Sequence, residues 1–486
     1  MADKKPVYIT TTLPYVNAKP HIGFAMEIIR ADVMARWKRA QGFEVFFNTG
    51  TDERGAKIFE AARKVGQKPQ VYVNEAAKKF QALIPLLNLS EPNFIRTTDS
   101  HHIKAAREFW KICAKNGHIY KKPYKIKYCV GCELEKTDSE LDNGKCPLHP
   151  TREIEEIEEE NYFFKFSAFQ KPLLALYEKY PDFVVPAERL GEIKSFVRRG
   201  LQDFSISRLK EKMPWGIEVP DDPTQVFYVW FDALVNYISA IGWPGDLEKF
   251  RKWQMDSGGM VQYCGKDNLR QQSAMWQAML MAAGLPPSRQ IVIDGFITGE
   301  GGVKMSKSLG NVISPAEIVN EYGADALRYF VTRELHPFED SPFTRERFKE
   351  AYNANLANGL GNLVSRILKM AEANIRDVNI LIHANNTNGA KFPREFIEAI
   401  EKYDLKTAMD FIWEKIQAAD KRIQATGPFK LVKTEPEKAK KIIGELLSGL
   451  SEIAKLLLPF LPETAEKILN LIETGKAPET PLFPRK

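Results

Sequence analysis

The stretch that most constrains the fold of this chain is residues 7–24, VYITTTLPYVNAKPHIGF. It opens as a short apolar run rich in β-branched residues, which predicts a buried strand. It ends in the tripeptide HIG, with His21 and Gly23, directly before an amphipathic helix pattern over residues 25–41 that Gly42 closes. Free backbone N–H groups and the positive end of the helix dipole meet at such a turn. The stretch therefore predicts a strand–turn–helix unit with an anion site at the helix start.

A second candidate phosphate site lies far along the chain, in the segment KMSKS at residues 304–308. Lys304 and Lys307 stand on a loop that is loosened upstream by Gly299, Gly301 and Gly302. Two lysines on a glycine-rich loop are what a movable phosphate clamp requires. Alone, each of the two segments is weak evidence, since a His-x-Gly is usually only a turn and a lysine pair is usually only a solvated loop.

Strand and helix patterns alternate through most of the chain. A second apolar strand at residues 43–47 runs into NTGTDE, and further apolar strands are predicted at residues 258–264 and 291–296. Carboxylates at the end of a parallel strand lie where open α/β sheets bind ligands. The pattern predicts an α/β fold with a doubly wound parallel, Rossmann-type sheet.

Two regions depart from this alternation. Residues 116–224 change to short aromatic and basic segments with a cysteine cluster and an acidic run at 153–160, before the strand-like FYVWF at 227–231 resumes the sheet. We interpret the acidic run as a solvated face. Beyond residue 344, long helical periodicities predict an all-α bundle. The predicted units are a first catalytic half at 1–116, an insertion at 117–224, a second catalytic half with the KMSKS segment at 225–343 and the helical bundle at 344–486.

Length and composition narrow the class of protein. At 486 residues the chain exceeds a single core, and a net charge of +6 tilts it only mildly toward polyanions. The opening MADKKPVY is not an apolar leader, and no run approaches the ~18 apolar residues of a membrane span. We therefore expect a cytoplasmic protein without a membrane partner.

The cysteines predict a metal site. Cys129-x2-Cys132 and Cys146-x2-His149 are two chelating pairs. Thiolates with one imidazole favour zinc, and four protein ligands leave no position for a catalytic water, so we expect one structural Zn²⁺ per chain. Cys113 lacks such a partner, as does the remaining cysteine, Cys264, and we expect both to be buried.

Taken in order, these motifs resemble the bacterial-type methionyl-tRNA synthetases, a class I aminoacyl-tRNA synthetase family, over essentially the whole chain. The resemblance rests on TTTLPYVNAKPHIG, NTGTDERGAKI, the CxxC…CxxH cluster, EEENYFFKFS, DFSISR, VWFDAL, IDGFITGEGGVKMSKSLGN and YGADALRYF. It implies that the chain activates L-methionine with ATP and transfers the methionyl group to the 3′ end of tRNA(Met). The chain ends after the helical bundle, and we expect a monomer.

The resemblance also implies roles for individual residues. His21, Lys304 and Lys307 are the expected catalytic residues, and Mg²⁺ is expected with ATP. The ATP site is expected to comprise these three with Gly23, Gly265, Asp267 and Ile297. For the methionine site we expect Asp52 at the amino group, and Leu13, Tyr15, Trp230, Ala233, Tyr237 and Gln272 around the side chain. Asn362, Arg366 and Phe429 match the anticodon contacts.

Several positions depart from the family pattern. Phe24 stands where the family has its second histidine, and Phe429 takes the place of a usual tryptophan. Gln271 and Gln272 replace a Phe-His pair, and Leu234 replaces a proline. Without the resemblance, Trp230, Ala233 and Tyr237 are better interpreted as the core stripe of a helix.

Two alternatives stay open on the sequence. One is a class I synthetase for another amino acid, although the insertion is too short for the editing domain of leucyl, isoleucyl or valyl enzymes. A cysteinyl enzyme instead uses its zinc in the active site to select a thiol. The other alternative is a zinc-containing RNA-binding protein that has lost catalysis, which the substitution at Phe24 and the two glutamines suggest.

Overall fold

A six-stranded parallel sheet forms the centre of the computed structural model, which describes residues 4–132, 134–136, 138–303, 305, 312–375 and 392–486. The strand order is β3-β2-β1-β12-β13-β7. The strands are β1 (Pro6–Thr11), β2 (Glu44–Thr51), β3 (Asn93–Arg96), β7 (Val184–Val185), β12 (Met260–Gly265) and β13 (Gln290–Asp294). Strands from before and after the insertion pair directly, since β1 lies beside β12 with Tyr8 opposite Met260. The predicted Rossmann-type sheet is therefore confirmed.

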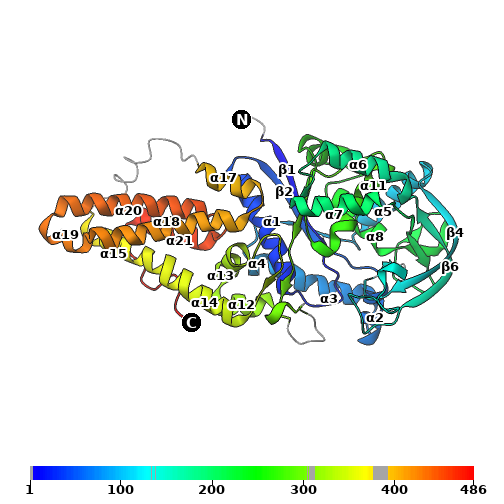
Figure 1. Cartoon of the computed structure of the whole chain (residues 1–486), viewed down its shortest axis with the longest axis horizontal. Coiled ribbons are helices and arrows are strands. Elements are labelled where there is room, and N and C mark those ends of the chain that lie inside the picture. The colour runs from blue at the N-terminus through cyan, green and yellow to red at the C-terminus, as the bar shows by residue number, and fades with distance from the viewer. Residues whose placement is uncertain (1–3, 133, 137, 304, 306–311, 376–391) are drawn as a thin grey trace.

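Helices cover both faces of the sheet (Figure 1). Successive strand residues point to opposite faces, so Ile9 and Val292 join one core while Tyr8 and Ile291 join the other. The first half supplies α1 (Ile22–Ala40), α2 (Ala56–Lys64), α3 (Pro69–Gln81), α4 (Leu83–Leu86) and α5 (Ser100–Lys115). The second half supplies α8 (Val229–Ala233), α9 (Asn236–Ser239), α10 (Leu247–Phe250), the π-helical η5 (Gln271–Met275), α11 (Trp276–Ala282), α12 (Pro315–Tyr322), α13 (Ala324–Tyr329) and the π-helical η8 (Phe330–Glu334).

Helix α1 is buried almost all round rather than amphipathic. Fourteen of its nineteen residues are buried, because it lies between the sheet and the helices that follow residue 344. It ends where Gly42 takes a φ of 89°, a conformation that glycine adopts without strain. The polar residues that suggested a solvated face, among them Arg30 and Asp32, have partners inside the protein.

The insertion builds its own antiparallel sheet, in the order β5-β4-β6-β8. These strands are β4 (Ile119–Cys129), β5 (Leu134–Lys136), β6 (Glu155–Phe164) and β8 (Phe204–Ser205), and helices α6 (Gln170–Lys179) and α7 (Ala187–Arg198) follow β6. The acidic run lies on β6 opposite the lysines of β4, with Lys125 beside Glu158 and Lys127 beside Glu156. Its exposed carboxylates thus form cross-strand pairs with cations on a mostly solvated face of the sheet.

Two details of the insertion differ from the predicted pattern. Strand β7 leaves the insertion to pair with β13, so the segment contributes an edge to the main sheet. The strand-like FYVWF is wrong as a single strand, because β11 (Asp222–Phe227) ends at its first residue and α8 begins two residues later. Strand β11 also pairs with β9 (Ser207–Leu209) and β10 (Glu218–Val219) in a separate small sheet. A continuous apolar run fits a buried helix as well as a buried strand.

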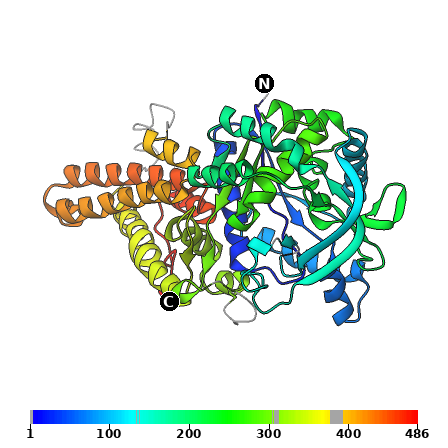
Figure 2. The ribbon, with the colours of Figure 1, turned by 45° about the vertical axis from the view of Figure 1, so that its right-hand side comes forward.

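After residue 344, the regular elements of the described residues are all helices, as predicted. They are α14 (Arg345–Ala351), the π-helical η9 (Tyr352–Gly361), α15 (Asn362–Asn374), α17 (Arg394–Glu401), α18 (Leu405–Thr426), α19 (Pro428–Thr434), α20 (Pro436–Leu457) and α21 (Pro462–Thr474). This bundle projects from the α1 side of the sheet with α19 at its far end (Figure 1), and the turned view agrees (Figure 2). Within the described residues, every helix is too short or too polar to span a bilayer.

Candidate active site and metal centre

A cavity of about 810 Å³ opens at the carboxyl edge of the parallel sheet. Its lining includes Thr12 after β1, Asp52 after β2, Gly265 at the end of β12 and Asp294 at the end of β13. This is the edge where open α/β sheets bind ligands, because loops rather than side-chain layers close it. The cavity brings together all the described residues predicted for ATP and methionine: Leu13, Tyr15, His21, Gly23, Asp52, Trp230, Ala233, Tyr237, Gly265, Asp267, Gln272 and Ile297.

One end of the cavity is the start of α1. His21 is the N-cap residue, and its Nδ1 accepts a hydrogen bond of 3.1 Å from the Gly23 backbone N–H. A Cβ at Gly23 would lie 3.1 Å from the His21 ring, so glycine lets the ring fold over the helix start. Phe24 also lines the cavity, and its ring meets Phe80 edge to face at 5.6 Å. The turn thus combines an exposed imidazole, a helix N-terminus and an apolar wall.

A short loop after β12 places a carboxylate at the same end. Gly265 precedes a tight turn over Lys266–Asn268, and a Cβ on Gly265 would come within 2.8 Å of Asp267 Oδ1. Lys266 forms an ion pair of 2.6 Å with Asp340, which holds the loop. The buried Ile297 adds an apolar surface. A carboxylate beside an apolar wall suits a ribose with an adjoining base.

A buried glutamate that the sequence analysis did not select also faces this end. Glu27 Oε1 accepts hydrogen bonds from the Thr12 backbone N–H at 2.7 Å and from its hydroxyl at 2.6 Å. Burial, together with the nearby carboxyls of Asp294 and Asp267, raises the pKa of Glu27 to about 8, and the hydrogen bonds from Thr12 offset only part of this shift. The only signal in the sequence was an acidic residue on a largely apolar helix.

The other end of the cavity is built by the loops after β1 and β2. Tyr15 and Asp52 pair as a parallel bridge, with the Val16 N–H donating to the Asp52 carbonyl at 3.2 Å. The Asp52 side chain is buried, and the Thr97 hydroxyl lies 3.5 Å from its Oδ1. Leu13 and Tyr15 line the cavity beside it. A buried carboxylate among apolar and aromatic groups can bind an ammonium group with an apolar substituent.

The opposite wall comes from α8, α9 and η5. Trp230 and Ala233 lie on α8, and Tyr237 lies on α9. Gln272 Nε2 donates to the Tyr237 hydroxyl at 2.8 Å, and Gln272 Oε1 accepts from Gln262 Nε2 at 2.9 Å. Burial raises the pKa of Tyr237 well above its ordinary value, so the phenol stays protonated. The Tyr237 hydroxyl therefore remains a hydrogen-bond donor in the lining of the cavity.

A buried ionic cluster, also missed from the sequence, holds the Trp230 helix in place. Asp232 Oδ1 lies 2.8 Å from His102 Nε2, and His102 Nδ1 lies 2.9 Å from the Ser239 hydroxyl. Arg54 Nε lies 3.5 Å from the other Asp232 oxygen. The cluster joins α5, α8, α9 and the loop after β2, so it positions Trp230 rather than contacting the cavity itself.

The predicted metal ligands converge. The ligand atoms of Cys129, Cys132, Cys146 and His149 all lie within 4.8 Å of one another. Cys132 Sγ is 3.4 Å from Cys146 Sγ and 3.3 Å from His149 Nδ1. A tetrahedron with Zn–S bonds of about 2.3 Å has edges of about 3.8 Å, so the four atoms need only small shifts to hold one ion. Cys113 and Cys264 are buried elsewhere, as predicted, and burial raises the pKa of both thiols.

The metal centre and the cavity share a wall. Gly131, Cys132 and His149 line the cavity, and a Cβ on Gly131 would come within 2.3 Å of the His149 ring. Lys57 Nζ donates to the Gly131 carbonyl at 2.7 Å and also lies 5.7 Å from the centre of the Tyr15 ring. One lysine from α2 thus bridges the chelating loop and the aromatic wall of the cavity.

The remaining predicted residues lie away from the cavity or outside the described residues. Lys304 and Lys307 belong to the latter group, so the predicted phosphate clamp stays a prediction. Arg366, on α15, forms an ion pair with Asp420 of α18, and Asn362 lies one turn earlier on an exposed position. Phe429 on α19 is 52% exposed at the far end of the bundle.

Comparison with known proteins gives one consistent result. The family model described as tRNA synthetases class I (M) matches residues 7–156 and 132–368. The chain is 40% identical over 480 residues to the methionine–tRNA ligase of Caldanaerobacter subterraneus subsp. tengcongensis, covering 96% of this chain and 74% of that protein. It is 38% identical over 491 residues to that of Rhizobium meliloti, covering 97% and 92%.

Solved structures agree with these matches. The Mycobacterium tuberculosis methionyl-tRNA synthetase in complex with methionyl-adenylate superimposes with a TM-score of 0.88 and 34% identity, covering 99% of this chain and 100% of that chain. The free form of the same enzyme gives a TM-score of 0.81 and 30% identity, covering 100% and 99%.

Proposed function

The chain belongs to the methionyl-tRNA synthetase family of class I aminoacyl-tRNA synthetases, and on that premise we propose which of its residues carry out the reaction. It is a methionine–tRNA ligase. The observation that carries the residue assignments is the single cavity in which an ammonium site, an aromatic pocket and a helix-start anion site adjoin one another.

Methionine occupies the Tyr15 end of the cavity in this proposal. Its ammonium group pairs with the buried Asp52, and its side chain lies among Leu13, Trp230 and Ala233. The Tyr237 proton donates to the thioether sulfur, because the hydroxyl oxygen already accepts from Gln272. Gln272 therefore contributes to recognition of the thioether in two ways. It orients the Tyr237 hydroxyl, and its second Nε2 hydrogen donates to the sulfur directly.

ATP occupies the α1 end. Asp267 accepts from the ribose hydroxyls, Gly265 lets the ribose approach, and Ile297 packs against the base. His21 and the helix start at Gly23 bind the triphosphate with Mg²⁺. Lys304 and Lys307 bind the leaving diphosphate.

The reaction has two steps, activation of methionine and transfer to tRNA, and both are catalysed by positioning and charge neutralisation. A methionine carboxylate oxygen attacks the α-phosphorus, the bond to the bridging oxygen breaks, and diphosphate leaves with the electron pair. In the second step, the terminal ribose hydroxyl of tRNA(Met) attacks the carbonyl carbon. AMP leaves, and the hydroxyl proton passes to a phosphate oxygen or to water.

Cys129, Cys132, Cys146 and His149 hold one Zn²⁺ in a structural role. The soft thiolates and the single imidazole fit that ion, and four protein ligands complete a tetrahedron. Zinc supplies a cross-link between the two chelating loops when it is bound. Since its ligands fill the coordination sphere, it does not select a thiol substrate as in a cysteinyl enzyme.

The helical bundle binds the anticodon arm of tRNA(Met). Phe429 offers an exposed ring for base stacking, and Asn362 with Arg366 offers hydrogen bonds on one helix face. The protein works as a cytoplasmic monomer, where a reducing environment keeps its five cysteines as thiols or metal ligands.

Methionine-dependent exchange of labelled diphosphate into ATP tests the proposal. We expect exchange with methionine far above that with homocysteine, leucine or cysteine. Exchange that is strongest with another amino acid would replace methionine by that substrate. No exchange with any of them, together with intact tRNA binding, would favour the RNA-binding alternative and reject the site assignments.

A further inference from the structure

Helix α1 carries two buried ions that bind different parts of the molecule. Arg30 pairs with the cavity-lining Asp294 at 2.9 Å and also donates to the carbonyls of Val331, His336 and Pro337. Two residues further along the helix, Asp32 accepts from the Ser90 N–H at 2.7 Å and from Arg36 at 2.9 Å. Both side chains are almost fully buried, so each needs its partners to remain ionised.

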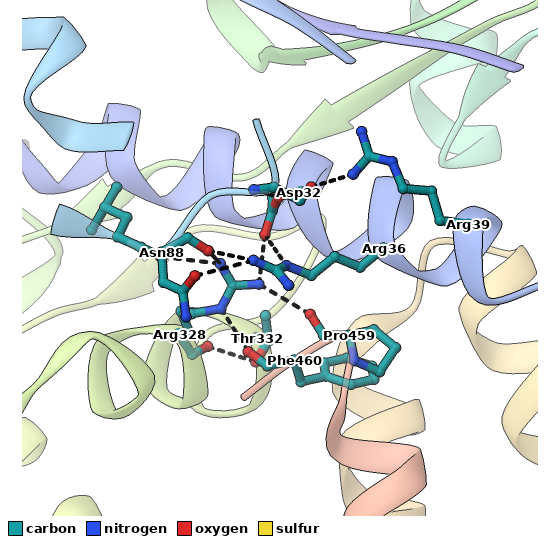
Figure 3. Close-up of polar contacts among 10 residues, drawn as sticks. Asp32, Arg36, Arg39, Asn88, Arg328, Thr332, Pro459 and Phe460 are labelled. Carbon is teal, nitrogen blue, oxygen red and sulfur yellow. Dashed lines mark hydrogen bonds and ion pairs between the residues drawn. The ribbon is translucent and has the colours of Figure 1, made fainter. Parts of the chain in front are cut away.

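A further partner of Asp32 is Arg328, which comes from α13. The Arg328 guanidinium lies 2.8 Å from Asp32 Oδ2, and both side chains are fully buried. The same guanidinium donates to the carbonyls of Pro459 at 3.0 Å and Phe460 at 2.7 Å, just beyond the end of α20. It also donates to the carbonyl of Leu87 at 3.2 Å, at the end of α4. Figure 3 shows this planar group at the centre of the cluster.

Electrostatics explains why an arginine stands there. The carbonyls at a helix C-terminus lack intrahelical donors and attract cations, and a guanidinium can donate in several directions at once. Burial by itself raises the pKa of a carboxyl such as Asp32, but Arg328 and Arg36 outweigh it and keep the pKa below its ordinary value. We call Asp32, Arg328 and the turn Pro459–Phe460 the arginine joint.

The joint lies midway along a helix whose two ends contact different units. The first residue before α1 is His21 at the cavity, and the last turns meet the bundle, where Glu401 of α17 accepts from Trp37 at 2.8 Å and from Lys38. Helix α1 is continuous between these points. A shift of the bundle at its base would therefore move the helix start as a unit.

We propose that the arginine joint ties the position of the anticodon bundle to that of α1, so that Arg328 is a positioning residue for the tRNA-dependent step. This proposal rests on the proposed function. RNA bound at the far end of the bundle displaces its base, and the joint passes that displacement to His21 and Glu27 at the ATP end of the cavity. Misplacement of bound groups by about 1 Å can slow a reaction by about a hundredfold, so a small shift suffices.

Hydrogen–deuterium exchange of the full chain tests the coupling directly. The anticodon stem-loop of tRNA(Met) is added, and the amides of the first turn of α1 are followed. We expect their protection to change in the wild type and to stay constant in Arg328→Lys, which keeps the charge beside Asp32 but loses the planar fork. No change in the wild type would overturn the proposal even when methionine-dependent exchange is active.

Kinetics of the same variant separates positioning from general damage. For Arg328→Lys we expect diphosphate exchange without tRNA, and the KM for tRNA, to stay within about threefold, while kcat for aminoacylation falls by about tenfold. Equal loss in both reactions would show a merely structural role and overturn the proposal. An inactive wild type in diphosphate exchange would instead reject the proposed function.

Two further variants keep the test decisive where Arg328→Lys folds poorly. Glu401→Ala removes the half-exposed contact at the other end of α1 and should lower the aminoacylation kcat by about threefold, with diphosphate exchange unchanged. Lys415→Gln breaks an ion pair with Glu452 inside the bundle and should change neither reaction. An effect of Lys415→Gln as large as that of Glu401→Ala would contradict the specific role of α1.

Discussion

At the residue scale, Phe24 is the departure with the clearest consequence. It lines the cavity one residue after Gly23 and packs edge to face on Phe80, so the triphosphate end is apolar on one side. Phe24→His adds a donor for a phosphate oxygen at the expense of that contact. We expect diphosphate exchange to accelerate about tenfold, because a charge-assisted hydrogen bond to the phosphate contributes about 1.5 kcal/mol. The protein should lose about 1 kcal/mol of stability, because the aromatic contact with Phe80 is lost. An unchanged or slower rate in a folded variant would count against the phosphate role of this turn.

Glu27 predicts a pH dependence of stability. Its pKa is about 8 in the folded protein against 4.5 ordinarily, so between these values only the unfolded state loses the proton. The contribution of Glu27 is thus fully present below pH 4.5 and is lost as pH rises to about 8, by about 1.4 kcal/mol per pH unit at most. Glu27→Gln keeps the acceptor for Thr12 without a titrating proton. Its melting temperature relative to the wild type should therefore rise from pH 5 to pH 8 and then level off; a difference independent of pH would refute the raised pKa.

The residues of the cavity differ in how far the sequence predicts them. Asp52 and Asp267 follow strand ends closely and His21 directly precedes α1, so local patterns and the family motifs select them. Asp232 and His102 are 130 residues apart in sequence, and Arg328 is still further from Asp32. The hydrophobic periodicity of a sequence does not predict which buried charged residues form ion pairs, because the pairing depends on how distant elements pack.

At the element scale, the chelating loop predicts a link between metal and methionine affinity. Lys57 binds the loop through Gly131 and covers the Tyr15 ring. Removing the metal with a chelator frees the loop, so we expect the KM for methionine to rise about threefold to tenfold and the KM for ATP to stay constant. Lys57→Met should give the same rise in the KM for methionine with full metal content. An unchanged KM for methionine after removal of the metal would show that the chelating loop and the Tyr15 wall of the cavity are independent.

Elements with a single strong pattern were predicted well, and those with ambiguous patterns were not. The β-branched runs of β1 and β13 appear close to the predicted residues, and the helical periodicity predicted beyond residue 344 includes the long helices α18 and α20. Segment 227–231 failed because its uniform apolar character suits a strand or a buried helix, and only packing decides between them. Strand β7 is two residues long, below what any sequence pattern can indicate.

At the scale of the whole molecule, the predicted catalytic halves and the bundle do not have separate cores. One hydrophobic core contains Ile9 of the sheet, Ile29 of α1, Leu327 of α13 and Leu447 of α20. The hydrogen bonds from Arg328 to Pro459 and Phe460 and the Trp37–Glu401 contact cross the same boundary. A boundary at residue 344 therefore marks a change of architecture rather than of folding unit.

Truncation tests this continuity. A fragment of residues 1–343 exposes the bundle-facing side of α1. It also leaves Arg328 without the carbonyls of Pro459 and Phe460, two of its four carbonyl acceptors. We expect the fragment to aggregate or to bind a hydrophobic dye, and the intact chain to lose the near-UV signals of Trp37 and Trp413 in one thermal transition. Charge removal alone, in Arg328→Gln with the chain intact, should lower the melting temperature by several degrees without splitting that transition. A monomeric 1–343 fragment that retains methionine-dependent exchange would show that the catalytic halves fold without the bundle, and that the shared core is a docking surface rather than one cooperative unit.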